Sequence, residues 1–304
     1  MAFSATDCAF EGFRVARRTP MTILIWAAAY VLFSALMFAL VGGSFIALIA
    51  AATDLQGVTN PTPADLEPFW AAYAGMMWIL PLSLVFSAVL YTASLRVVLH
   101  PAEKGFGYMR LGMDEVRVFV VTLVLCVLGA IAGAVVFGLT GVLAGLAGAA
   151  AGDAGGLIAF VLILAAIVFF IWLAVRFSLA LPITVAEKKF AIFESWNMTK
   201  GRVWGLIGMT LIVIVMAIVV SILASIIILP LMFFTGNISE LAAMEGADIG
   251  QIMSAMGPAI AIYVISNSII SALSLAIFMA PYAAAYRDIR GGAEPVVVEP
   301  TPSM

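Results

Sequence analysis

The sequence predicts an all-α membrane protein with six transmembrane helices, arranged as three repeats of a cytoplasmic amphipathic helix, a long span and a return span. Composition gives the class: 64% of the 304 residues are hydrophobic and 10% are charged, whereas about 25% of the residues in soluble domains are charged. The apolar residues also gather in six stretches close to or above the ~20 residues that a helix needs to cross a bilayer.

The spans follow one another along the chain with polar segments between them. We expect them at residues 21–52, 69–95, 118–151, 157–175, 203–234 and 257–286. The first apolar run is much longer than the roughly 7–15 residues of a signal-peptide core. We therefore expect it to be a retained span rather than a cleaved leader.

The basic residues predict the orientation. All 14 Lys and Arg residues lie before the first span, between spans two and three, between spans four and five, or after the sixth. The other loops, around 53–68, 152–156 and 235–256, carry only acidic charges. The positive-inside rule then places both termini in the cytoplasm. The net charge of −3 reflects these acidic outer loops, so it predicts no nucleic-acid partner.

Three cytoplasmic segments share a residue pattern and are named here the first, second and third cassettes. Residues 10–20, 106–116 and 193–203 each begin with Phe, have a bulky apolar residue three places on, and have a small residue or Thr six places on. Each cassette precedes an odd-numbered span, which predicts a threefold repeat.

The domain organisation follows from this repeat. We expect a single six-span domain over residues 1–290, with repeats at about 8–98, 104–186 and 190–290. The remaining segment, 291–304, is predicted to be a disordered cytoplasmic tail.

The cassettes suit the membrane interface. At the third, Phe190, Phe193 and Trp196 recur every three positions, with Lys189 and Lys200 among the polar residues. This pattern is typical of a short amphipathic helix that lies at headgroup level with its rings toward the acyl chains. The predicted interfacial anchors of the three cassettes are Phe10, Phe13, Phe106, Met109, Phe193 and Trp196. They can simply hold the bundle at its depth, or they can border a lipid site.

The spans carry packing and polar patterns but no charge at their centres. Gly129 with Gly133, and Gly141 with Gly145, form pairs of small residues that predict a close helix crossing. Polar residues recur at helical spacing in the second and sixth spans: Ser83, Ser87, Tyr91, Ser94, Asn267, Ser271 and Ser274. These stripes can line a polar cleft or hydrogen-bond between helices. The lack of Asp, Glu, Lys or His in the middle of any span is untypical of ion-coupled transporters.

The sequence offers no catalytic or metal-binding set. His100 is the only histidine, and the two cysteines, Cys8 and Cys126, are too isolated to form a zinc set. Asp114 and Glu115 are expected to form a solvated turn. We therefore predict no enzymatic activity, no cofactor and no metal.

Arginines mark the cytoplasmic ends of the three return spans. Arg176 is distinctive because the apolar segment FSLALPITVA follows it before the next charge. A guanidinium offers a planar fork of donors that suits a phosphate, but the same residue can also be a snorkelling anchor. The predicted headgroup contacts, at these ends and around the third cassette, are Arg96, Arg176, Lys188, Lys189, Lys200, Arg202 and Arg287.

An Arg–apolar–Pro–apolar–Glu run, an aromatic Glu-Ser-Trp core and Thr-Lys-Gly follow one another within residues 176–205. The pattern is carried by Arg176, Pro182, Glu187, Ser195, Trp196, Thr199, Lys200 and Gly201, followed near the end by Pro281, Tyr286 and Arg287. It resembles the membrane domain of bacterial glycerophosphoryl diester phosphodiesterases and its uncharacterised stand-alone six-span relatives. The resemblance implies a helical bundle in a bacterial inner membrane. In the phosphodiesterases a soluble domain carries out catalysis; these residues contain no such domain, so that activity is not expected here.

These features predict a non-enzymatic bacterial inner-membrane protein that binds or organises phospholipid at the cytoplasmic leaflet, or that scaffolds protein partners. One alternative is a transporter or channel for a small solute or lipid, which would use the polar stripes of the second and sixth spans. An intramembrane enzyme is a third alternative, for which the sequence shows no catalytic set.

Overall fold

The computed structural model describes residues 4–56, 58, 60–103, 105–151, 153–235 and 249–291. Across these ranges the regular structure is helical and no strand occurs. Six helical segments are long and apolar enough to cross a membrane, which confirms the predicted fold class: Pro20–Asp54, Pro63–Leu99, Phe106–Ala150, Ala154–Glu187, Val203–Pro230 and Gly257–Arg290. The predicted tail beyond residue 291 and the central part of the predicted outer loop 235–256 lie outside the described residues.

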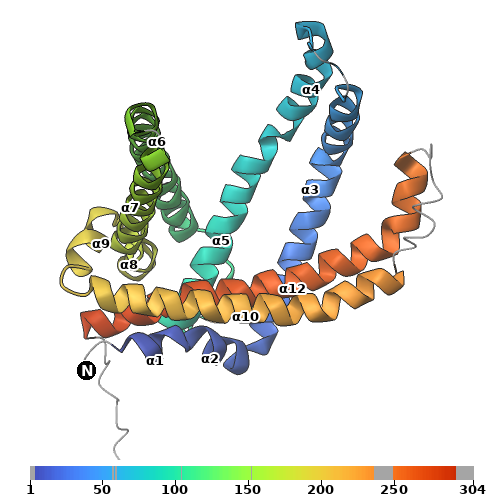
Figure 1. Cartoon of the computed structure of the whole chain (residues 1–304). Helices are drawn as coiled ribbons and strands as arrows, with labels where there is room; N and C mark the ends of the chain where they lie inside the picture. Colours follow the sequence, from blue (N-terminus) through green and yellow to red (C-terminus); the bar gives the residue numbers. More distant parts are fainter. Residues whose placement is uncertain are drawn as a thin grey trace, which may run out of the picture.

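The spans form three helical hairpins that point in different directions from a shared base (Figure 1). In the first hairpin, α3 (Pro20–Asp54) is followed by α4 (Pro63–Gly75), the 3-10 turn η1 (Met76–Trp78) and α5 (Ile79–Leu99). The second hairpin pairs α6 (Met113–Ala151) with α7 (Asp153–Phe177), and the third pairs α10 (Val203–Thr235) with α12 (Ile249–Arg290). Helices suit these apolar stretches because each satisfies its backbone hydrogen bonds internally, as a lipid environment requires.

Short elements at the base precede or connect the hairpins. They are α1 (Ala5–Ala9), α2 (Glu11–Arg18), η2 (Phe106–Tyr108), α8 (Ala180–Glu187) and α9 (Phe193–Met198). α12 holds the base together, because it packs against α2, α3, α5 and α10.

The buried core lies at this base. Trp26 of α3, Leu95 of α5 and Ile277 of α12 are among the largest fully buried side chains. The Trp26 indole Nε1 donates a hydrogen bond of 2.8 Å to the carbonyl oxygen of Gly107, which ties α3 to the second cassette. Large side chains farther along the hairpins, such as Ile227 of α10, are exposed. Lipid tails are as apolar as these side chains, so the protein gains little by burying them against itself.

The close helix crossings are not where the sequence predicted them. A Cβ atom added at Gly129, Gly141 or Gly145 would meet no heavy atom within 4 Å, and one at Gly133 would lie an ordinary 3.6 Å from Phe170 Cζ. The prediction of a close crossing at these glycines is therefore wrong for the described chain. The pattern places small residues on one helix face, but it does not say whether that face meets another helix.

The tightest approach at the base instead joins α2 to α12. A Cβ atom at Gly12 would stand 2.5 Å from the Cα of Ile277 and 2.8 Å from the carbonyl oxygen of Ala276. Only a residue without a side chain fits here, so Gly12 sets the distance between these two helices.

The three cassettes differ in local structure. The first and third contain the helices α2 and α9, as predicted for amphipathic segments. The second forms only the 3-10 turn η2, with positive φ at Gly107 and Tyr108, and its helix does not begin until Met113. Glycines at 105, 107 and 112 explain the difference, because glycine disfavours a continuous helix. The threefold repeat therefore stays a prediction.

The orientation across the membrane is also a prediction, and thiol labelling can test it. In a chain carrying Cys8→Ser and Cys126→Ser, we expect Gln56→Cys and Glu245→Cys to react with a membrane-impermeant maleimide in intact cells. Residue 245 lies outside the described residues, in a predicted outer loop. Lys200→Cys, in the third cassette, should react only after permeabilisation. Labelling of Lys200→Cys alone in intact cells would reverse the orientation.

Candidate functional site

Arg176 lies in the last turn of α7, between two tryptophans. The centre of its guanidinium is 5.4 Å from the ring centroid of Trp172 and 5.0 Å from that of Trp196. Its Nη1 donates to the carbonyl oxygen of Trp196 and to the hydroxyl of Thr199, both at 3.3 Å. A cation over an aromatic face is attracted by about 0.5–2 kcal/mol, depending on its desolvation. Arg176 is therefore held in place by both rings and by the third cassette.

Local sequence explains how these residues meet. Trp172 and Arg176 are four residues apart on α7, so their side chains share one face of the helix. After α8, the chain returns so that the Ser195 hydroxyl donates to the Arg176 carbonyl oxygen at 2.7 Å and accepts the backbone N–H of Leu179 at 3.2 Å. Ser195 thus links α9 to the end of α7. The sequence pattern included Ser195 and Thr199 but assigned neither a role.

The charge of Arg176 has no counter-ion in the described part of the chain. No carboxylate oxygen there lies within 4.0 Å of its guanidinium nitrogens. Its Nε atom is buried and has no hydrogen-bond partner among the described residues. A buried donor without a partner costs about 1–3 kcal/mol. Nη1 carries both hydrogen bonds and Nε is buried, so Nη2 is the nitrogen left to donate to an acceptor from outside the chain.

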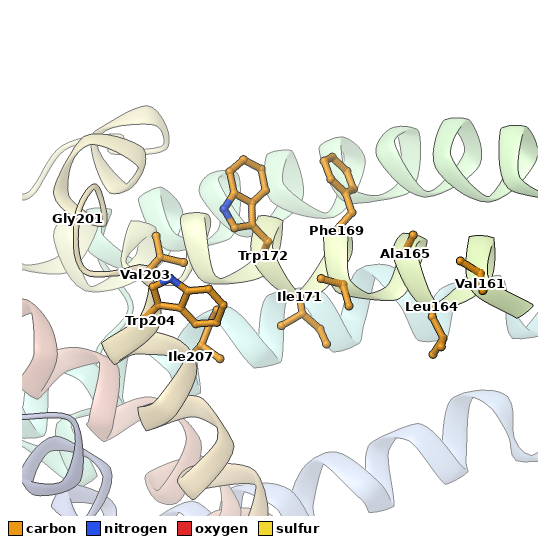
Figure 2. Close-up of a pocket in the computed structure, with 11 residues that line it drawn as sticks. Val161, Leu164, Ala165, Phe169, Ile171, Trp172, Gly201, Val203, Trp204 and Ile207 are labelled. Atoms are coloured by element: carbon orange, nitrogen blue, oxygen red, sulfur yellow. The ribbon is translucent and has the colours of Figure 1, made fainter.

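An apolar groove of about 1040 Å³ adjoins this arginine. Figure 2 shows side chains of α7 and of the first turns of α10 along it. Trp172 lines the groove and also stacks on Arg176. Gly201, just before α10, and Val203, its first residue, also line the groove, and the indole of Trp204 is 85% exposed. The polar groups of Arg176 and the long apolar surface of the groove are therefore neighbours, with Trp172 between them.

Arg96 occupies a similar place at the end of α5 but has different surroundings. It is buried, its Nη1 lies 2.5 Å from Glu115 Oε1, and its Nη2 lies 3.0 Å from Asp114 Oδ2. Asp114 also pairs with Arg117 at 2.7 Å. The expectation of a solvated turn at residues 114 and 115 is wrong, because Glu115 is buried against Arg96. The protein neutralises this arginine with its own carboxylates.

Some of the other predicted headgroup contacts form ion pairs with carboxylates of the chain, and others do not. Lys189 is paired with Glu187 at 2.7 Å and with Glu194 at 2.9 Å. The exposed residues without a carboxylate within 4.0 Å in the described ranges are Lys188, Lys200, Arg202 and Arg287. Lys200 and Arg202 flank Gly201, so they lie where the groove opens. Lys200 directly follows Thr199, which Arg176 contacts, whereas Arg96 is paired with its own carboxylates at the end of α5.

The predicted interfacial anchors differ in how exposed their side chains are. Phe10, Phe13, Phe106 and Phe193 are exposed, whereas Met109 and Trp196 are half-buried. Trp196 therefore serves the arginine site rather than only the surface. Trp172 was not among the predicted residues, although its position one helical turn before Arg176 is a signal that could have identified it.

The two polar stripes do not meet in the apolar groove that contains one of their residues. Ser83 lines a second apolar groove, of about 770 Å³, together with residues of α3 and Ile260 of α12. The other stripe residues do not line this groove, and Asn267 is exposed. The stripes therefore form no shared polar path there.

Reactive groups are few in the described chain. Its residues include no group of three His, Cys, Asp or Glu side chains that could hold a metal ion. Cys8, in α1, donates a hydrogen bond of 3.4 Å to Asp288, and burial raises the pKa of its thiol to about 12. This thiol is therefore protonated at neutral pH and is a poor nucleophile.

The six spans define a multi-pass α-helical membrane protein. Comparisons of the chain with protein-family models, with curated proteins and with solved structures found no match.

Proposed function

We propose that this chain is a non-enzymatic protein of a bacterial inner membrane that binds an anionic phospholipid headgroup at the cytoplasmic leaflet. Arg176 is the residue that contacts the phosphate. One observation carries the proposal: a guanidinium fixed between two indoles has no hydrogen-bond partner for Nη2 and no carboxylate partner in the described chain. The motif resemblance and the one-sided distribution of basic residues support the bacterial inner membrane and the orientation.

The contrast with Arg96 supports an external anion. Both arginines lie in the last turn of a return span. Arg96 receives two carboxylates from the next span, whereas Arg176 receives only a carbonyl and a hydroxyl oxygen, both on Nη1. An arginine left uncompensated next to a membrane is well suited to bind an anion. A phosphate oxygen can accept a charge-assisted hydrogen bond from Nη2, which has no partner in the described chain.

The surrounding charges favour a lipid over a neutral ligand. Lys200 and Arg202 are exposed, follow Thr199, which Arg176 contacts, and have no acidic partner in the described ranges. Each basic residue close to an anionic membrane surface contributes about 1 kcal/mol of attraction. These two residues therefore bring an anionic headgroup to the interface, and Arg176 provides the directional contact.

Arg176→Lys tests the role of the fork, because it keeps the positive charge needed for topology. We expect retention of phosphatidylglycerol by the purified chain to fall about tenfold, a change equivalent to about 1.4 kcal/mol, because the planar guanidinium with its fixed donor direction is lost. Native mass spectrometry measures the fraction of protein that carries lipid. Arg18→Lys, the same substitution at an exposed arginine of α2, is the matched control and should retain lipid like the wild type. Equal retention by Arg176→Lys and the wild type would overturn the proposal.

A further inference from the structure

We infer that the site binds a whole phospholipid, with an acyl chain lying in the apolar groove between α7 and α10 while the headgroup contacts Arg176. The ligand class is thus a long-chain anionic glycerophospholipid rather than a free phosphate or a headgroup held only at the surface. This inference rests on the proposed function and adds a second recognition element, the groove.

The headgroup site and the groove share structure. Trp172 stacks on the guanidinium of Arg176 and also lines the groove. Gly201, between the basic residues Lys200 and Arg202, lines the same groove. A molecule with a phosphate at Arg176 would have its next atoms beside Trp172 and the open apolar groove, which is the arrangement of a phospholipid.

The length of the groove matches one membrane leaflet. Its α7 wall runs from Val161 to Trp172, which is roughly 17 Å at about 1.5 Å per helical residue. The hydrocarbon core of a bilayer is about 30 Å thick, so one leaflet is about 15 Å. The groove thus extends from the predicted cytoplasmic interface to about the middle of the membrane, as an acyl chain does.

The lining selects an apolar occupant. Its side chains include those of Leu164, Val168 and Ile207, and no charged side chain among the described residues lines it. Val168 is 65% exposed and Trp204 is 85% exposed, so the protein itself does not cover these surfaces. A chain that leaves the bilayer for the groove gains no hydrophobic energy, because both surroundings are apolar. Its gain is van der Waals contact, which depends on chain length and fit.

A comparison of two lipids with the same headgroup tests the groove directly on the unmodified chain. Dioleoyl and dioctanoyl phosphatidylglycerol are added separately to the purified protein in detergent, and bound lipid is measured by native mass spectrometry. We expect the wild type to retain the dioleoyl lipid about tenfold better, equivalent to about 1.4 kcal/mol. An excess of glycerol 3-phosphate should not displace it. Equal retention of both lipids, or displacement by glycerol 3-phosphate, would overturn the inference.

Two matched double variants locate the effect. Leu164→Trp with Val168→Trp fills the groove, and Ile163→Trp with Ile167→Trp places the same bulk on exposed positions of α7 that do not line it. We expect the groove pair to lose the preference for the dioleoyl lipid while still binding the dioctanoyl lipid, and the control pair to behave like the wild type. If the groove pair still prefers the dioleoyl lipid, the inference about the groove is wrong, and the proposed headgroup function is unaffected. The proposed headgroup function fails separately, if Arg176→Lys retains both lipids like the wild type.

Discussion

Glu115→Ala is expected to lower the free energy of unfolding by about 3 kcal/mol, because removing one partner of a buried ion pair leaves an uncompensated charge behind. Arg96 is 4% exposed and would keep only the second carboxylate, Asp114. The substitution also removes the acceptor of the Gly112 backbone N–H, which lies 3.0 Å from Glu115 Oε2. Both losses occur at the junction between α5 and α6, where the first hairpin joins the second.

The matched control is Glu103→Ala. Glu103 pairs with Arg110 at 3.3 Å, but both side chains are more than a third exposed. An exposed pair contributes about 0–1 kcal/mol, so this variant should stay close to the wild type. Denaturant or thermal unfolding in detergent compares the variants. A similar loss for Glu103→Ala and Glu115→Ala would show that burial does not distinguish the two pairs.

Gly12→Ala is expected to destabilise the base by about 1–3 kcal/mol, the usual cost of forcing an extra group into a packed contact. The new Cβ atom would stand 2.5 Å from the Cα of Ile277, and a backbone atom cannot rotate away as a side chain can. α2 would have to move off α12. The cost would exceed the gain of about 1 kcal/mol that alanine brings to a helix over glycine.

Gly141→Ala is the control for this contact. It lies within α6, where an added Cβ atom meets no heavy atom within 4 Å. Only the helix propensity then changes, so this variant should melt at or above the wild-type temperature. If Gly12→Ala also melts at or above that temperature, the contact between α2 and α12 is not close-packed in solution.

The candidate site was partly accessible from the sequence. Arg176 was a candidate because apolar residues surround it, and Trp196 was expected at the membrane interface. That Trp196 and Trp172 enclose the guanidinium required the return of α9 to the end of α7, which the Ser195 hydrogen bonds fix. Sequence spacing shows which residues share a helix face, but it does not show how a connecting segment folds back.

The sequence by itself determined the six helical spans, because apolar length and the need to satisfy backbone hydrogen bonds in lipid leave few other structures. Only the tertiary structure decided which glycine is a close crossing and which arginine is neutralised. Gly12 meets Ile277 from the other end of the chain, and Arg96 meets Glu115 of the second cassette, whereas Arg176 meets no carboxylate in the described residues. Such contacts depend on how separate helices approach in space, and a membrane sequence encodes that weakly because lipid and protein surfaces are equally apolar.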